Sequence, residues 1–83
     1  MKLAQYVKFR EEKFGGVVFE TRSEKVYTLN PTAAAVVREI EAGLDEHAIP
    51  ARLRELFHDD GGAIEREAVA FISELRQKGL VEE

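Results

Sequence analysis

The chain has 83 residues, which fits a single domain, 1–83, and leaves no room for a second hydrophobic core. Hydrophobic residues make up 45% and charged residues 34% of it, a composition typical of a folded globular domain rather than a disordered chain. There is no cysteine, so disulfides, thiolate metal sites and cysteine nucleophiles are excluded. No apolar run has the length of a signal peptide or of a membrane span, and we expect a cytoplasmic protein that makes no contact with a membrane.

The net charge of −4 is unevenly distributed along the chain. Residues 1–30 carry six basic and four acidic side chains, whereas residues 31–83 carry six basic and twelve acidic ones. The N-terminal part therefore favours an anionic partner more than the C-terminal part does.

Three short segments within the first thirty residues have the alternating pattern of β-strands. The first is Gln5–Arg10, the second is Gly16–Thr21, and the third is Lys25–Leu29. The polar connection 22–24 has the length of a hairpin loop, and such short connections favour an antiparallel meander. A sheet this small must be covered on one face by helices.

The remainder of the chain has helical periodicity. Asn30 is suited to cap a helix and Pro31 to occupy its first position, with Thr32 as a competing cap. Gly43 ends this helix. The apolar face recurs at helical spacing, at Ala33, Val36, Val37, Ile40 and Leu44.

A second helix is expected after Asp45, which is a candidate cap. Pro50 falls late for a helix start, so we expect an irregular first turn or a later beginning. The apolar stripe of this helix contains Ile49, Leu53, Leu56 and Phe57, and residues 58–62 form a loop.

The last helix is expected from about Ala63 to Lys78, with Gly79 as its stop and Leu80–Val81 packing back on the domain. It has two adjacent stripes. One faces the core and contains Ile64, Ala68, Phe71 and Leu75. The other is half apolar and contains Glu65, Val69, Ile72 and Arg76. This second stripe favours either a groove wall or packing against a neighbouring element.

Three strands followed by three helices predict an α+β fold of winged-helix-like arrangement: a three-stranded antiparallel sheet followed by three helices. The whole chain, moreover, resembles the PqqD-like family, also called RiPP recognition elements. The resemblance is carried in order by GVVFETRSEKVYTLN, LNPTAAAVVREIEAG, HAIPARLRELF and EAVAFISELRQKGLVEE. Two positions depart from the family pattern: Val37 stands where many members have Trp, and Pro31 replaces a commoner acidic residue.

The resemblance implies a non-catalytic peptide chaperone of natural product biosynthesis, without a cofactor. Such domains bind the leader segment of a ribosomally made precursor peptide and present it to a modifying enzyme, typically a radical S-adenosylmethionine (SAM) maturase. The leader is expected to lie as an added strand against Lys25–Leu29, in the cleft between this strand and the last helix.

The physical properties of an edge strand agree with this expectation, because its unpaired N–H and C=O groups can be satisfied by an extended peptide. We expect Lys25 and Arg76 to meet acidic leader residues, and we interpret Leu29 and Phe71 mainly as core. The same free edge offers a surface through which two copies form a homodimer. The expected peptide-binding residues are Lys25, Val26, Tyr27, Thr28 and Leu29 on the strand, with Glu65, Val69, Ile72 and Arg76 on the helix.

Other functions find less support in the residues. No nucleophile lies in a known motif beside His47 or His58, so we expect no enzyme and no catalytic residue. A metal site at 58–60 is disfavoured because adjacent side chains rarely converge on one ion. The main alternative is a winged-helix DNA-binding domain reading DNA through Arg52 and Arg54, but acidic residues surround both arginines and oppose nucleic acid. A domain that docks a maturase without binding a peptide is the third possibility.

Overall fold

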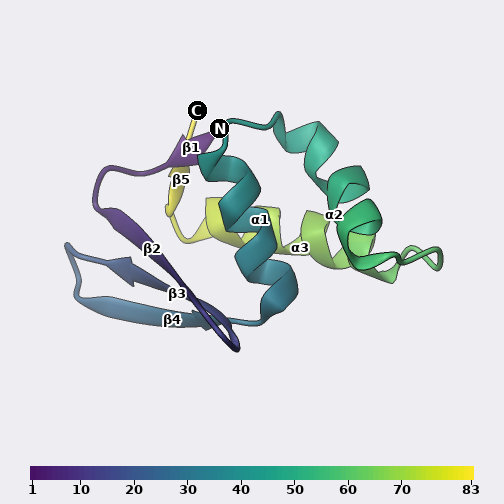
Figure 1. Ribbon diagram of the computed structural model, residues 1–83. Helices are drawn as coiled ribbons and strands as arrows, with labels where there is room; N and C mark the ends of the chain where they lie inside the picture. Colours follow the sequence, from purple (N-terminus) through teal and green to yellow (C-terminus); the bar gives the residue numbers. More distant parts are fainter.

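The computed structural model describes all residues 1–83, with a three-stranded antiparallel sheet covered on one face by helices and a separate two-stranded pair formed by the chain ends (Figure 1). The sheet contains β2 (Val7–Glu12), β3 (Gly15–Glu20) and β4 (Lys25–Leu29) in the order β2-β3-β4. β3 is therefore central, and β2 and β4 each keep one edge that no strand covers. The predicted fold class is confirmed, and the first strand begins and ends two residues later than expected.

Glu20 and Lys25 are the residue pair that closes the turn between β3 and β4. Glu20 stabilises this turn. The Glu20 carboxylate is largely buried and accepts hydrogen bonds from the Ser23 hydroxyl and from the backbone N–H groups of Arg22 (2.7 Å) and Ser23 (3.2 Å). These hydrogen bonds, that of the Ser23 hydroxyl foremost, hold the pKa of Glu20 below its ordinary value. The charged form of this carboxylate thus fixes the hairpin that presents β4.

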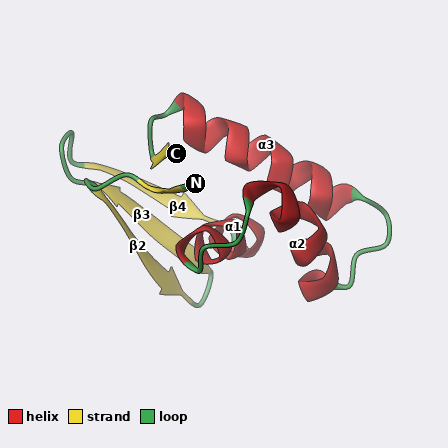
Figure 2. Cartoon of the chain, turned by 90° about the horizontal axis from the view of Figure 1, so that it is seen from above, coloured by secondary structure: helices red, strands yellow, loops and turns green.

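The first helix, α1 (Pro31–Glu41), begins as the residues around the junction predict. The Asn30 side chain accepts a hydrogen bond from the backbone N–H of Ala33 at 2.8 Å, and Pro31 takes the first helical position. Thr32, the competing cap, is buried instead. Figure 2 shows α1 nearly end-on between the sheet and the other two helices. α1 is therefore packed against the sheet on one side and against α2 and α3 on the other.

The second helix has the irregular start that Pro50 predicts. A 3₁₀ turn, η1 (Glu46–Ala48), precedes α2 (Ile49–Phe57), and Pro50 lies in the first turn of α2. Asp45 makes no capping hydrogen bond with its side chain. α2 ends at Phe57 and is followed by His58, which has a left-handed backbone with φ of 52°.

The third helix, α3 (Ala63–Gln77), is capped from the preceding loop. The Asp59 carboxylate accepts hydrogen bonds from the backbone N–H groups of Ile64 (2.9 Å) and Gly61 (3.3 Å), and that of Ile64 is the first cause of the lowered pKa of Asp59. The Asp59 carboxylate is thus engaged in capping the start of α3. α3 ends before Gly79, whose φ of +71° is readily adopted by glycine.

The chain ends pair with each other, which the sequence did not predict. β1 (Lys2–Leu3) forms an antiparallel pair with β5 (Val81–Glu82), so the two termini lie side by side (Figure 1). The Tyr6 hydroxyl donates to the Gly79 carbonyl at 2.6 Å. This pairing buries Leu80, as its expected packing requires, and fixes the C-terminal end of α3.

The core lies where α1 meets the sheet, α2 and α3. No helix of the chain combines the length and the apolar character that a membrane crossing demands. The largest fully buried side chains are Ile40, Ile49, Leu53, Leu75, Val18, Val36 and Val37.

Candidate functional site

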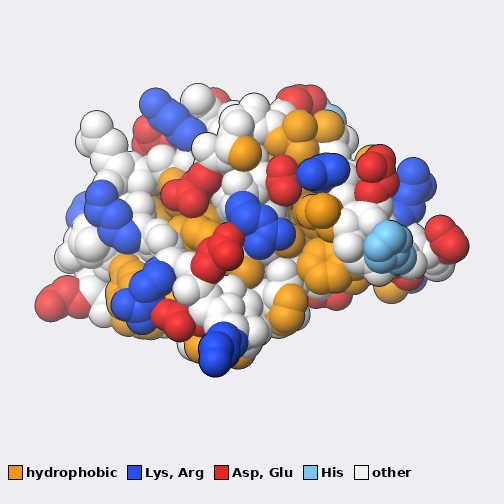
Figure 3. Space-filling model, viewed as in Figure 1, with side chains coloured by type: hydrophobic (Ala, Val, Ile, Leu, Met, Phe, Trp, Pro, Cys, Tyr) orange, Lys and Arg blue, Asp and Glu red, His pale blue; other side chains and the backbone are white.

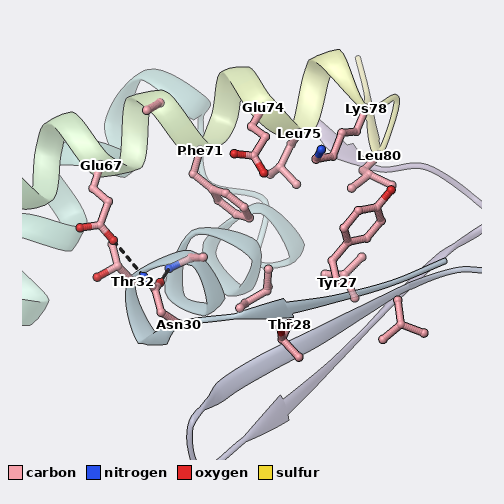
Figure 4. A pocket seen from close by; sticks show the side chains of 15 residues that line it. Tyr27, Thr28, Asn30, Thr32, Glu67, Phe71, Glu74, Leu75, Lys78 and Leu80 are labelled. Carbon is pink, nitrogen blue, oxygen red and sulfur yellow. Dashed lines mark hydrogen bonds between the residues drawn. The ribbon is translucent and has the colours of Figure 1, made fainter.

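A groove of about 540 Å³ lies between the free edge of β4 and α3 (Figure 4). It follows the chain from Val26 in β4 to Asn30 at the cap of α1, and it extends past the first turn of α1 to α3. Most of its lining is apolar, with a few polar groups. The lining residues are Val18, Val26, Tyr27, Thr28, Leu29, Asn30, Thr32, Ala33, Glu67, Ala70, Phe71, Glu74, Leu75, Lys78 and Leu80.

The strand wall is formed by the side chains of Tyr27 and Leu29, with Val26 and Thr28 along its outer rim. Tyr27 is half-buried and points toward the C-terminal end of α3, whereas Thr28 points away from the helix (Figure 4). Leu29 is buried at the base of the wall, and Val26 is 58% exposed. Four of the five expected strand residues thus line the groove, while Lys25 lies beyond its end and is exposed.

The helix wall is formed by one flank of α3. Glu67, Phe71, Glu74 and Lys78 recur at spacings of four, three and four residues, which places them on one side of a helix. Phe71 is half-buried and supplies the largest apolar surface of this wall. Phe71 therefore packs against the core, as the sequence predicts, and also lines the groove.

The helix residues expected from the sequence do not line this groove. Ile72 is only 5% exposed and belongs to the core, and Val69 lies beside a separate shallow hollow with Pro50. Glu65 is 3.4 Å from the guanidinium of Arg54 on α2. Because successive helix residues turn by about 100°, the stripe of Glu65, Val69, Ile72 and Arg76 faces η1 and α2 rather than β4. This expectation is corrected: the opposite flank of α3 faces the strand.

Arg76 is engaged in ion pairs away from the groove. Its guanidinium donates to the carboxylates of Glu46, in η1, and of Glu83, at 2.9 Å. The hydrogen bond to Glu46 is the first cause both of the raised pKa of Arg76 and of the lowered pKa of Glu46. Arg76 therefore links η1 to the C-terminus, and Lys78 is the basic side chain that lines the groove.

Each end of the groove is marked by a contact between its walls. At one end the Asn30 amide donates to the Glu67 carboxylate at 3.3 Å (Figure 4). At the other end the Lys78 ammonium lies 5.5 Å from the centre of the Tyr27 ring. Asn30 thus both caps α1 and holds the helix wall beside the end of β4.

The surface of α2 does not have the features of a DNA-reading helix. Arg52 and Arg54 lie 4.0 and 3.4 Å from the carboxylates of Glu39 and Glu65. The face shown in Figure 3 mixes acidic and basic side chains without a continuous basic patch. Phosphate contacts need unpaired cations, so this geometry weakens the DNA-binding alternative.

The fold and the groove define the class: a small α+β domain with a free strand edge beside an apolar groove. The model of the family described as "Coenzyme PQQ synthesis protein D (PqqD)" matches residues 15–81. The chain belongs to the PqqD family, which confirms the resemblance seen in the sequence. No curated protein gives a significant match.

Two solved structures have the same fold. One is described as "TbiB1 in Complex with the TbiA(beta) Leader Peptide", with a TM-score of 0.83 and 20% identity over 99% of this chain and 95% of that one. The other is described as "Lasso peptide synthetase B1 complexed with the leader peptide", with a TM-score of 0.79 and 22% identity over 99% and 96% of the two chains.

Proposed function

We propose that the protein is a non-catalytic peptide-binding domain, in which an extended segment adds as a fourth strand to the free edge of β4. The observation that carries this proposal is the juxtaposition of that edge with the apolar groove and α3. The backbone of β4 offers hydrogen bonds, and the groove receives every second side chain of the added strand.

Binding requires both the backbone hydrogen bonds of β4 and the apolar groove. Each added backbone hydrogen bond contributes about 0.5–1.5 kcal/mol net, which does not distinguish one sequence from another. Selectivity therefore depends on the apolar lining, where Phe71, Ala70 and Val26 offer an accessible surface for one or two apolar side chains. Every second residue of β4 turns its N–H and C=O to the free edge, and the side chains of Val26, Tyr27 and Thr28 form the rim.

The segment we propose is the leader of a ribosomally synthesised precursor peptide. Two observations support this: membership of the PqqD family, and the leader peptides named for both structural relatives. The partner enzyme that receives the bound precursor is, by the family resemblance, a radical SAM maturase. The chain itself supplies recognition and positioning, and the partner carries out the chemistry.

The test is a titration of ¹⁵N-labelled protein with a synthetic peptide of the leader encoded beside its gene, followed by NMR. We expect shifts in residues 25–30 and on the 67–78 flank of α3, with little change on α2. Outward-facing amides of β4 become protected from hydrogen exchange, because they then pair with the peptide. Backbone N-methylation at alternate peptide positions abolishes binding, whereas methylation at the intervening positions does not.

Shifts confined to Arg52 and Arg54, on addition of duplex DNA and not of peptide, would replace this proposal by the DNA-binding one.

The maturase is tested separately. Copurification of the chain with the radical SAM enzyme encoded nearby, strengthened by the leader peptide, supports that partner. Copurification that is equal without any peptide supports a docking domain instead.

A further inference from the structure

Two exposed charged side chains on the helix wall, Glu74 and Lys78, have no ion-pair partner within 4.0 Å. Glutamate four residues before lysine is the favoured order for an ion pair on a helix, yet Glu74 and Lys78 do not form one. Lys78 lies over the Tyr27 ring instead. In Figure 4 both side chains lie on the groove side of α3. They are therefore available to a third group that enters the groove.

The spacing of these two charges matches that of an added strand. Four helix residues rise by about 6.0 Å along the axis, and two strand residues span about 6.6 Å. α3 and β4 run alongside one another in Figure 4, so a strand between them follows both. Side chains two positions apart on one face of the peptide thus come opposite Glu74 and Lys78.

We propose that Glu74 and Lys78 select the bound peptide by charge: it carries a basic side chain opposite Glu74 and, two residues away, an acidic one opposite Lys78. This rests on the proposed function, because the charges matter only if a strand enters the groove. An antiparallel strand, the more stable pairing per residue, then reads basic-x-acidic from its N-terminal to its C-terminal end.

The neighbouring charges support this order. Glu67 lies two turns before Glu74 on the same flank, so the groove is acidic toward Asn30 and basic toward Tyr27. An acidic side chain opposite Glu74 would meet a like charge, which disfavours peptides with the reverse charge order. Exclusion of peptides with the wrong charge order is the main effect, since exposed ion pairs add little affinity.

The experiment uses a random twelve-residue peptide library displayed on phage. It is selected on the wild-type protein, on the charge-swapped Glu74→Lys/Lys78→Glu, and on the control Glu55→Lys/Lys8→Glu. Both double variants preserve the net charge and change exposed side chains that have no ion-pair partner. Thermal unfolding checks that all three proteins are folded, and NMR shifts locate each enriched peptide.

We expect the wild type and the control to enrich basic-x-acidic peptides, and the swapped variant to enrich acidic-x-basic ones. A peptide selected on the wild type should bind the swapped variant about fivefold more weakly or worse. Exchanging the two charges within that peptide should weaken its binding to the wild type in the same way, which requires no protein variant.

Two other outcomes separate the inference from its premise. Peptides that shift groove amides yet show the same charge order on the wild type and the swapped variant would overturn charge selection and leave the proposed function intact. Failure of every enriched peptide to shift groove amides would overturn the proposed function, and the inference with it.

Discussion

At the scale of single residues, Phe71 and Val69 separate the groove from the rest of α3. Phe71 lines the groove and is half-buried, whereas Val69, two residues earlier, is 57% exposed on another flank. We expect Phe71→Ala to weaken binding of the leader peptide about tenfold, because it removes the largest apolar surface of the helix wall. The measurement is fluorescence anisotropy of a labelled peptide.

Val69→Lys is the matched control for this prediction. Its free energy of unfolding should change by less than about 0.5 kcal/mol, because the side chain is largely in solvent. Peptide affinity should also be unchanged. A loss of affinity in Val69→Lys equal to that in Phe71→Ala would mean that the peptide crosses the α2 side of the helix.

A second residue, Glu20, makes the stability of the hairpin depend on pH. The pKa of Glu20 is lowered in the folded protein, chiefly by the Ser23 hydroxyl, so its charged form is favoured by folding. The stabilisation is therefore present above the ordinary glutamate range and is lost as the pH falls through the folded-state pKa.

We expect Glu20→Gln to melt below the wild type at pH 7, and the difference in melting temperature to shrink as the pH falls below about 4. The measurement is thermal unfolding by circular dichroism across this range. Glu24→Gln, a change in the same turn at an exposed side chain without an ion-pair partner, is the control. A pH-independent difference for Glu20→Gln would show that its charge is not responsible.

At the scale of elements, the junction between β4 and α1 positions both walls of the groove. The Asn30 side chain accepts from the Ala33 N–H and donates to Glu67. We expect Asn30→Ala to cost about 1 kcal/mol of stability, as the loss of a helix cap usually does. This lowers the melting temperature by about 4–8 °C in a domain of this size.

Asn30→Ser distinguishes the two hydrogen bonds of Asn30. Serine keeps a capping oxygen but has no amide to reach Glu67, so most of the stability should return. Equal melting temperatures for the alanine and serine variants would assign the effect to the contact with Glu67 instead of the cap.

The β2–β3 hairpin also depends on this junction. A Cβ added to Gly15 would lie 2.1 Å from the Leu29 carbonyl oxygen, and Gly15 has φ of +143°. We expect Gly15→Ala to destabilise the domain by at least about 2 kcal/mol, measured by urea unfolding. Gly61→Ala is the control, because its nearest contact would be 3.6 Å from Asp59, and it should be nearly neutral.

Local sequence predicts most of these elements because their signals are local. The alternating side-chain pattern predicts β4. Asn30–Pro31 marks the start of α1, and Pro50 marks the first turn of α2. The β1–β5 pair escaped prediction because two-residue strands have no periodicity and depend on chain ends that meet only in the fold. The helix wall was assigned to the wrong flank of α3 because both flanks mix apolar and charged residues, and only the packing decides which one faces β4.

At the scale of the whole molecule, the two free sheet edges differ in how well they resist self-association. β2 exposes charged side chains along its length, including Lys8, Arg10 and Glu11, and such charges discourage pairing. β4 exposes the uncharged Val26 and Thr28 and has only Lys25 at its start. We therefore expect homodimers to form through β4 at high protein concentration.

Self-association through β4 and peptide binding would use the same backbone groups, so each should exclude the other. Sedimentation velocity across a range of protein concentrations should show a dimer that dissociates when the leader peptide is added in excess. Val26→Lys should reduce dimerisation by placing charge on the edge. A dimer that persists while NMR shows the groove occupied would place the contact elsewhere, and β2 would then be the edge to examine by Lys8→Val.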